Sequence, residues 1–106
     1  MIKTDLQKIY MPMTETAFYI LLSLQEPRYG YSIMQFVEEL TSGRIQFGAG
    51  TMYGSLSKLK KDGLIEIIKE ENKRKIYQTT SLGNDLLKIE KERINELYLN
   101  AERVKD

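Results

Sequence analysis

The chain has 106 residues, of which 42% are hydrophobic and 29% charged, and its net charge is +1. This length and composition indicate one globular domain, and no apolar run approaches the roughly 18 residues that span a bilayer. Neither cysteine nor histidine occurs, which removes the usual zinc ligands and the usual nucleophile–base pairs. We therefore expect no enzyme activity, no catalytic or metal site and no cofactor. A cytoplasmic location without a secretory signal fits this composition.

The first predicted elements are an arm and a buried helix. Residues 1–12 are polar and are expected to form a short N-terminal arm. A helix capped by Thr14 is expected to run to about Gln25. Its stretch 17–24 is apolar nearly all the way round, which is typical of a helix buried on more than one side. A small monomer offers little room for such burial, so this helix indicates a partner subunit.

Two further helices follow. Apolar residues recur at helical spacing over about 31–41, and Ser42-Gly43 is a suitable stop. The next loop carries Ile45 and Phe47, which are expected to enter the core. A third helix is then expected over about 49–62.

A β-hairpin and a last helix complete the chain. Residues 64–68 are rich in β-branched side chains, 70–73 are turn-like, and 75–79 return as a second strand. The last helix is expected to begin at a Thr80 or Ser81 cap. The predicted fold class is therefore mainly α with a small β-hairpin, a winged helix-turn-helix with a long C-terminal dimerisation helix. The expected boundaries are 1–12 for the arm, 13–79 for the DNA-binding domain and 80–106 for the dimerisation helix.

Basic residues gather at the two places where a winged helix meets a duplex. One group, which includes Lys58 and Lys61, lies on the third predicted helix, and the other, 73–75, lies at the hairpin tip. The outward face of that helix is small, polar and basic, so that its backbone can approach a groove and its side chains can bind phosphates or base edges. The residues expected to bind double-stranded DNA are Tyr31, Gly50, Thr51, Tyr53, Gly54, Ser57, Lys58, Lys61, Lys73, Arg74 and Lys75.

The last predicted helix carries an apolar stripe over about 24 residues, or roughly 36 Å. One domain of this size cannot cover that length, so the stripe should pack on a second copy. A two-fold dimer would place two third helices about one DNA turn apart, near 34 Å, and would match a palindromic operator. A helix folded back on its own domain is the alternative. The expected interface residues are Phe18, Leu22, Leu86, Ile89, Ile94, Leu97, Tyr98 and Ala101.

Several stretches resemble the PadR family of transcriptional regulators in its compact form. These stretches are 28–31, 48–53, 56–65, 74–77 and 80–83. The resemblance covers about 13–83 and implies a dimeric repressor whose C-terminal helix forms the dimer, with Tyr53 and its neighbours on DNA. It also implies release by small planar molecules such as phenolics or drugs.

Two features depart from the family pattern. Thr79 stands where the family often has Leu, which is a small change at a strand end. The chain also has no tryptophan, the residue on which some compact relatives stack flat drugs at the dimer centre. For a planar ligand at a dimer interface, Tyr98 and Phe18 are the aromatic side chains that remain, and they would be weak substitutes.

Three alternatives remain, the first from the same broad class and the other two from different classes. A MarR-like regulator would usually need a longer chain with an extra dimerisation helix. A winged-helix module that binds protein and not DNA should carry exposed aliphatic side chains in place of Gly54, Ser57, Lys58 and Lys61. An enzyme would need a site built from Asp and Glu alone, and the acidic residues lie among lysines at helix-surface spacing.

Overall fold

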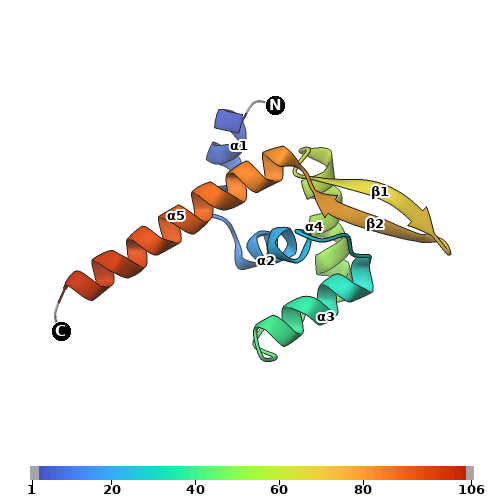
Figure 1. Ribbon diagram of the computed structural model, residues 1–106, viewed down its shortest axis with the longest axis horizontal. Helices are drawn as coiled ribbons and strands as arrows, with labels where there is room; N and C mark the ends of the chain where they lie inside the picture. The colour runs from blue at the N-terminus through green and yellow to red at the C-terminus, as the bar shows by residue number, and fades with distance from the viewer. Residues whose placement is uncertain (1–2, 105–106) are drawn as a thin grey trace.

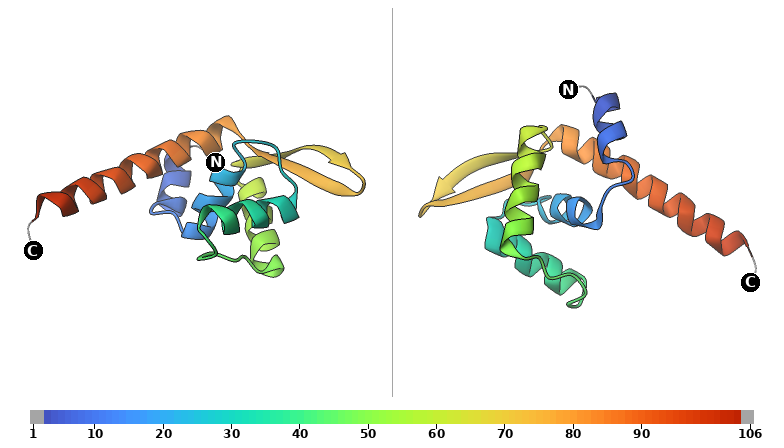
Figure 2. Two further views of the ribbon diagram at one scale, coloured as in Figure 1. Left: turned by 60° about the horizontal axis from the view of Figure 1, so that its bottom comes forward. Right: turned by 180° about the vertical axis from the view of Figure 1, so that it is seen from behind.

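Within residues 3–104, which the computed structural model describes, the chain forms five helices and a two-stranded antiparallel hairpin that extends from one side of the helical body (Figures 1 and 2). The elements are α1 (Lys3–Tyr10), α2 (Glu15–Ser23), α3 (Gly30–Leu40), α4 (Ala49–Lys61), β1 (Ile65–Glu71), β2 (Arg74–Thr79) and α5 (Ser81–Arg103). Helices α2, α3 and α4 gather beside the hairpin, and α5 projects beyond them. This confirms the predicted winged helix-turn-helix, in which α4 takes the position that the recognition helix has in this fold and the hairpin takes that of the wing.

The N-terminal segment differs from the short arm that the sequence predicts. Residues 1 and 2 lie outside the described residues, and the next eight form α1. Leu6 is fully buried and Tyr10 is 8% exposed. Side chains four residues apart lie on the same face of a helix, so α1 is held against the body by these two residues.

Threonine side chains cap the N-termini of two helices, α2 and α5. Oγ1 of Thr14 accepts a hydrogen bond from the Ala17 N–H at 3.1 Å, and Oγ1 of Thr80 accepts one from the Gly83 N–H at 3.1 Å. Each bond satisfies an N–H group that has no partner inside its helix. The Thr80 hydroxyl also donates to the Gly63 carbonyl oxygen at 2.7 Å, which links the end of α4 to the start of α5.

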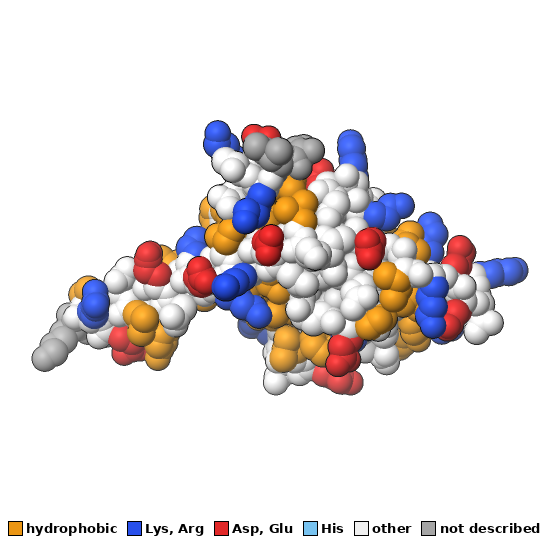
Figure 3. Space-filling model, turned by 45° about the horizontal axis from the view of Figure 1, so that its top comes forward, with side chains coloured by type: hydrophobic (Ala, Val, Ile, Leu, Met, Phe, Trp, Pro, Cys, Tyr) orange, Lys and Arg blue, Asp and Glu red, His pale blue; other side chains and the backbone are white. Residues whose placement is uncertain are grey.

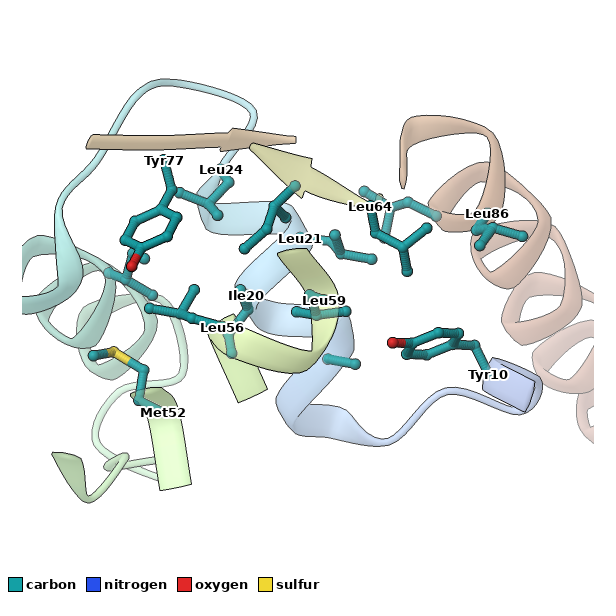
Figure 4. Close-up of a cluster of buried hydrophobic side chains, with 14 of the residues drawn as sticks. Tyr10, Ile20, Leu21, Leu24, Met52, Leu56, Leu59, Leu64, Tyr77 and Leu86 are labelled. Carbon is teal, nitrogen blue, oxygen red and sulfur yellow. The ribbon is translucent and has the colours of Figure 1, made fainter. Parts of the chain in front are cut away.

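The core lies where α2, α4, the hairpin and the first half of α5 meet (Figure 4). Met52, Leu56 and Leu59 form the inner stripe of α4 and are at most 2% exposed. Ile45 and Phe47 pack against this core from the loop before α4, as the sequence predicts. Because the apolar side of α4 is buried in the core, its polar and basic side faces solvent.

The wing turns through two residues, Asn72-Lys73, both in the left-handed region with φ of 50° and 64°. A two-residue turn of this kind suits the twist of an antiparallel hairpin, and asparagine is favoured in it. Opposite charges face each other beside the turn, since Glu70 pairs with Lys75 and Glu71 with Arg74. Such cross-strand pairs stabilise a hairpin, and they extend the strands beyond the predicted limits.

The two halves of α5 have different surroundings. Leu86, which was expected at a dimer interface, is fully buried in the core of its own chain. Ile94, Leu97 and Tyr98 in the second half are 41%, 53% and 61% exposed. Residues 105–106 of the predicted dimerisation helix lie outside the described residues.

Although α5 is the longest helix, neither it nor any other helix of residues 3–104 is long and apolar enough to cross a membrane.

Candidate nucleic-acid interface

An open cleft of about 380 Å³ lies between the start of α3, the outer face of α4 and the wing. Its lining residues are Tyr29, Gly30, Tyr53, Ser57, Lys73, Arg74, Lys75 and Tyr77. Five of them were expected to bind DNA, two from α4 and three from the wing tip. The fold thus brings Tyr53 and Ser57 of α4 and the wing-tip residues 73–75 into one surface, which we call the α4–wing cleft.

Tyr53 forms one wall of the α4–wing cleft through a close contact with α3. The side chain is 49% exposed. A Cβ atom on Gly30 would lie only 2.8 Å from Cζ of the Tyr53 ring, so any larger residue at this position would displace the end of the Tyr53 side chain. Burial, and to a lesser degree the neighbouring Tyr53, raises the pKa of Tyr77 beyond its already high ordinary value. Tyr77 therefore stays a neutral hydroxyl in the cleft at physiological pH.

Arg74 contributes a cation to the opposite wall. Its guanidinium carbon lies 4.6 Å from the centre of the Tyr29 ring, within the range of a cation–π contact. The side chain is exposed. Stacking on Tyr29 orients the guanidinium and leaves its N–H groups available to an anion.

The wing is joined to the helices through Arg28. The backbone of this residue exchanges two hydrogen bonds with Tyr77 of β2, at 3.1 and 2.9 Å. Its guanidinium donates to the Ser23 carbonyl oxygen and stacks 4.1 Å from the centre of the Phe36 ring. These contacts hold the wing in a fixed position beside α3.

The outer face of α4 is open to solvent. Thr51, Ser57 and Lys61 are exposed, and, apart from the adjacent residues and the backbone of α4 itself, no atom lies within 4 Å of a Cβ built on Gly50 or Gly54. Gly48 caps the helix without a side-chain hydrogen bond to its first turn. Free N–H groups at a helix N-terminus bind anions readily. Tyr31, 57% exposed near the start of α3, is the remaining predicted contact from outside α4 and the wing.

Lys58 is placed differently from the other predicted DNA contacts. Its Nζ lies 3.2 Å from Oδ2 of Asp62 and 5.2 Å from the centre of the Tyr10 ring. The side chain lines a separate cleft of about 210 Å³ between α1, α2 and α4. The structure therefore does not bring Lys58 together with the wing.

Three residues of the α4–wing cleft were missed by the sequence analysis, namely Tyr29, Gly30 and Tyr77. Tyr29 and Gly30 belong to the family-like stretch 28–31, which was the signal that could have indicated them. Tyr77 is 8% exposed and follows the exposed Lys75 by two residues, so strand alternation alone places it on the same side of the wing.

The predicted dimer surface lies on α2 and α5. A cleft of about 390 Å³ lies along the surface where these helices meet, and Phe18 and Ile94 are among its lining residues. Leu22 and Ile89 are partly buried against the core. Beyond the body, Figure 3 shows hydrophobic side chains on the projecting part of α5 and basic side chains at the wing. Leu97, Tyr98 and Ala101 are exposed on that part of α5.

A buried carboxylate joins the two helices that border this cleft. Glu90 is 1% exposed and accepts hydrogen bonds from Nε and Nη2 of Arg93 at 2.6 and 2.7 Å. It also accepts one from the backbone N–H of Met13 at 3.0 Å, just before α2. The Arg93 guanidinium, aided by the Met13 N–H, holds the pKa of Glu90 below its usual value despite burial.

Comparison with known proteins agrees with this architecture. The PadR-like family of transcriptional regulators matches residues 20–89. An uncharacterised protein of Lysinibacillus sphaericus is 36% identical over 70 residues, which are 62% of this chain and 64% of that protein, a little under two thirds of its length.

Two solved structures extend the likeness over most of the chain. A PadR family transcription regulator from Clostridium difficile is 28% identical with a TM-score of 0.67, covering 86% of this chain and 100% of the other. A PadR-like transcription factor from Bacteroides fragilis is 27% identical with a TM-score of 0.68, covering 97% of each chain. The family match runs from the end of α2 into the first half of α5 and covers more than half of the chain, so the chain belongs to the PadR-like family of transcriptional regulators.

Proposed function

We propose that this protein is a transcriptional repressor that binds a palindromic DNA operator as a homodimer. The observation that carries the proposal is the α4–wing cleft, where the open face of α4 meets the basic residues 73–75. Membership of a family of transcriptional regulators supports double-stranded DNA as the partner. Repression is the mode that the resemblance to PadR implies.

The geometry supports entry of α4 into the major groove. Gly50 and Gly54 let the helix backbone approach the bases, while Thr51, Tyr53 and Ser57 offer hydroxyl groups. The uncapped N–H groups at the start of α4 favour a phosphate. In this arrangement the wing tip lies over the adjacent phosphates or minor groove.

The composition of α4 argues against a winged helix that binds protein in place of DNA. Such a module needs exposed aliphatic side chains on this helix. Tyr53 is the one large hydrophobic residue exposed on α4, and the rest of the open face is glycine, hydroxyl or lysine.

The projecting half of α5 supports a homodimer. Ile94, Leu97 and Ala101 continue the same helical face as Leu86, which is buried within its own chain. This face leaves the body of the domain in mid-helix, and within residues 3–104 of one chain it stays exposed. A second copy, related by a two-fold axis, would cover it and present two α4 helices to one duplex.

We further propose that a small planar ligand binds in the cleft between α2 and α5, the α2–α5 cleft, and thereby releases the repressor from DNA. Phe18 and Tyr19 meet there edge to face, with ring centres 5.6 Å apart. A partner subunit would add the exposed Tyr98 of its own α5. In the absence of tryptophan, these aromatic side chains are the available stacking surfaces.

The proposal is tested with labelled duplexes from the DNA that flanks the protein's own gene. Fluorescence anisotropy at several salt concentrations should show binding that weakens as salt rises. The double variant Lys58→Ala, Lys61→Ala should bind all duplexes more weakly, and its salt slope should fall by up to about 2, since each lost phosphate contact removes about 0.9.

A matched control removes two exposed lysines from α5, Lys88 and Lys91, which belong to neither α4 nor the wing. This control should bind like the wild-type protein. Unchanged affinity in the α4 variant, or an equal loss in the α5 control, would remove α4 from the DNA-binding surface.

A further inference from the structure

We infer that Asp62 and Tyr10 position the ammonium group of Lys58, and that Lys58 exchanges Asp62 for a DNA phosphate when the protein binds DNA. In this scheme α1 moderates the DNA affinity of the recognition helix. The inference rests on the proposed function, because it assumes that α4 binds DNA.

The three side chains meet at one carboxylate oxygen. Oδ2 of Asp62 accepts a hydrogen bond from the Tyr10 hydroxyl at 2.7 Å and another from Lys58 Nζ at 3.2 Å. The Asp62 side chain is 8% exposed, whereas the Lys58 side chain is 60% exposed. Asp62 is therefore the fixed member of the pair and Lys58 is the member that solvent or a ligand can reach.

Tyr10 makes this arrangement depend on α1. The tyrosine is buried, and Leu6 one turn earlier anchors the same helix in the core. The Tyr10 ring also lies beneath the Lys58 ammonium, which provides a second favourable contact for the cation. The position of Lys58 in the free protein is thus set by a helix 48 positions earlier in the chain.

Exchange of partners costs little at this site. The contact between Lys58 and Asp62 is a pair of the i, i+4 type whose lysine end is exposed to solvent, and such pairs contribute little to stability in water. When Lys58 leaves, Asp62 keeps the hydrogen bond from Tyr10 and the nearby charge of Lys61, both of which lower its pKa. The carboxylate is therefore not left without a partner.

Lys61 provides the internal comparison. It is exposed on the same helix, and within residues 3–104 no carboxylate oxygen lies within 4.0 Å of its Nζ. A phosphate can bind Lys61 without displacing another group. Lys58 must first give up Asp62, so it should contribute less to DNA affinity than Lys61 does.

A double-mutant cycle tests the exchange in the full-length protein. Asp62→Asn removes the charge but keeps an oxygen that can accept the Tyr10 hydrogen bond. At low salt it should tighten binding to a labelled duplex by about threefold, the effect of one exposed ion pair. In the Lys58→Ala background the same substitution should change affinity by about 1.5-fold or less. In the Lys61→Ala background the full gain should persist.

The outcomes separate the possible explanations. If Asp62→Asn tightened DNA binding equally with Lys58 present and in the Lys58→Ala background, Asp62 would only repel DNA through space. That result would overturn the proposed exchange. No gain in either background would also overturn it. If the wild-type protein bound no duplex at any salt concentration, the proposed function itself would fail. Circular dichroism melting curves establish that each variant is folded before its affinity is compared.

Discussion

At the scale of single residues, Gly83 illustrates how closely the wing and α5 are joined. A Cβ atom at this position would lie 2.7 Å from Cγ2 of Thr79 and 3.1 Å from the backbone carbonyl carbon of Leu64. Neither neighbour can move freely, since Leu64 and Thr79 are buried where the two strands meet the helices. Glycine is required here for space.

Gly83→Ala should therefore lower the free energy of unfolding by about 1–3 kcal/mol, the usual effect of overpacking, although alanine favours a helix. The control is Gly54→Ala, because the space around Gly54 is open and the substitution should be neutral or slightly stabilising. Urea unfolding followed by circular dichroism measures both changes. Equal stability of the two variants would contradict the packing account.

Residue-level prediction from sequence succeeded where helical periodicity was enough. The 3.6-residue repeat placed Gly54, Ser57 and Lys61 on the outer side of α4, opposite the buried stripe, and the structure has them exposed. It could not predict that Tyr10 donates a hydrogen bond to Asp62 and lies beneath the Lys58 ammonium, because these contacts join distant parts of the chain.

At the scale of elements, the ends of most helices could be predicted because local chemistry marks them. Thr14 and Thr80 cap α2 and α5, and Gly63 with φ of 80° follows the end of α4. Helix α1 could not be predicted in this way. An isolated helix of eight residues is unstable in water, so α1 depends on the burial of Leu6 and Tyr10 against the body, which no local pattern reveals.

The contact between α5 and the start of α2 should make stability depend on pH through Glu90. Its pKa is lower in the folded protein than its ordinary value, so the folded state is favoured while the carboxylate is charged. This stabilisation is fully present above about pH 4.5, near the pKa of an unfolded glutamate, and is lost as the pH falls through the lowered value.

Glu90→Gln should lower the free energy of unfolding at pH 7 by about 1.5–3 kcal/mol, the range for hydrogen bonds to a charged group. The variant should also lose less stability than the wild type between pH 5 and pH 3. Thermal unfolding across this pH range provides the measurement, with the exposed Glu92→Gln as a control on the same helix. Parallel pH profiles for wild type and Glu90→Gln would show that the contact is unimportant.

At the scale of the whole molecule, the sequence predicted a long helix that outgrows its domain, and α5 has this form. Periodicity groups Leu86 and Leu97 on one stripe but cannot show where the domain body ends along the helix. The structure divides the stripe, since Leu86 is fully buried and Leu97 is 53% exposed. The proposed dimer surface is therefore the second half of α5, together with Phe18 and Ile94 of the α2–α5 cleft.

The central claim is that a dimer places two recognition helices in successive major grooves of one duplex. Hydroxyl-radical footprinting on the duplex that binds most tightly tests it directly. We expect two protected stretches whose centres are about 10 base pairs apart, or a multiple of that distance, and Leu97→Glu should abolish the paired protection at the same protein concentration. A single protected stretch for the wild-type protein, or paired protection that survives Leu97→Glu, would contradict the account.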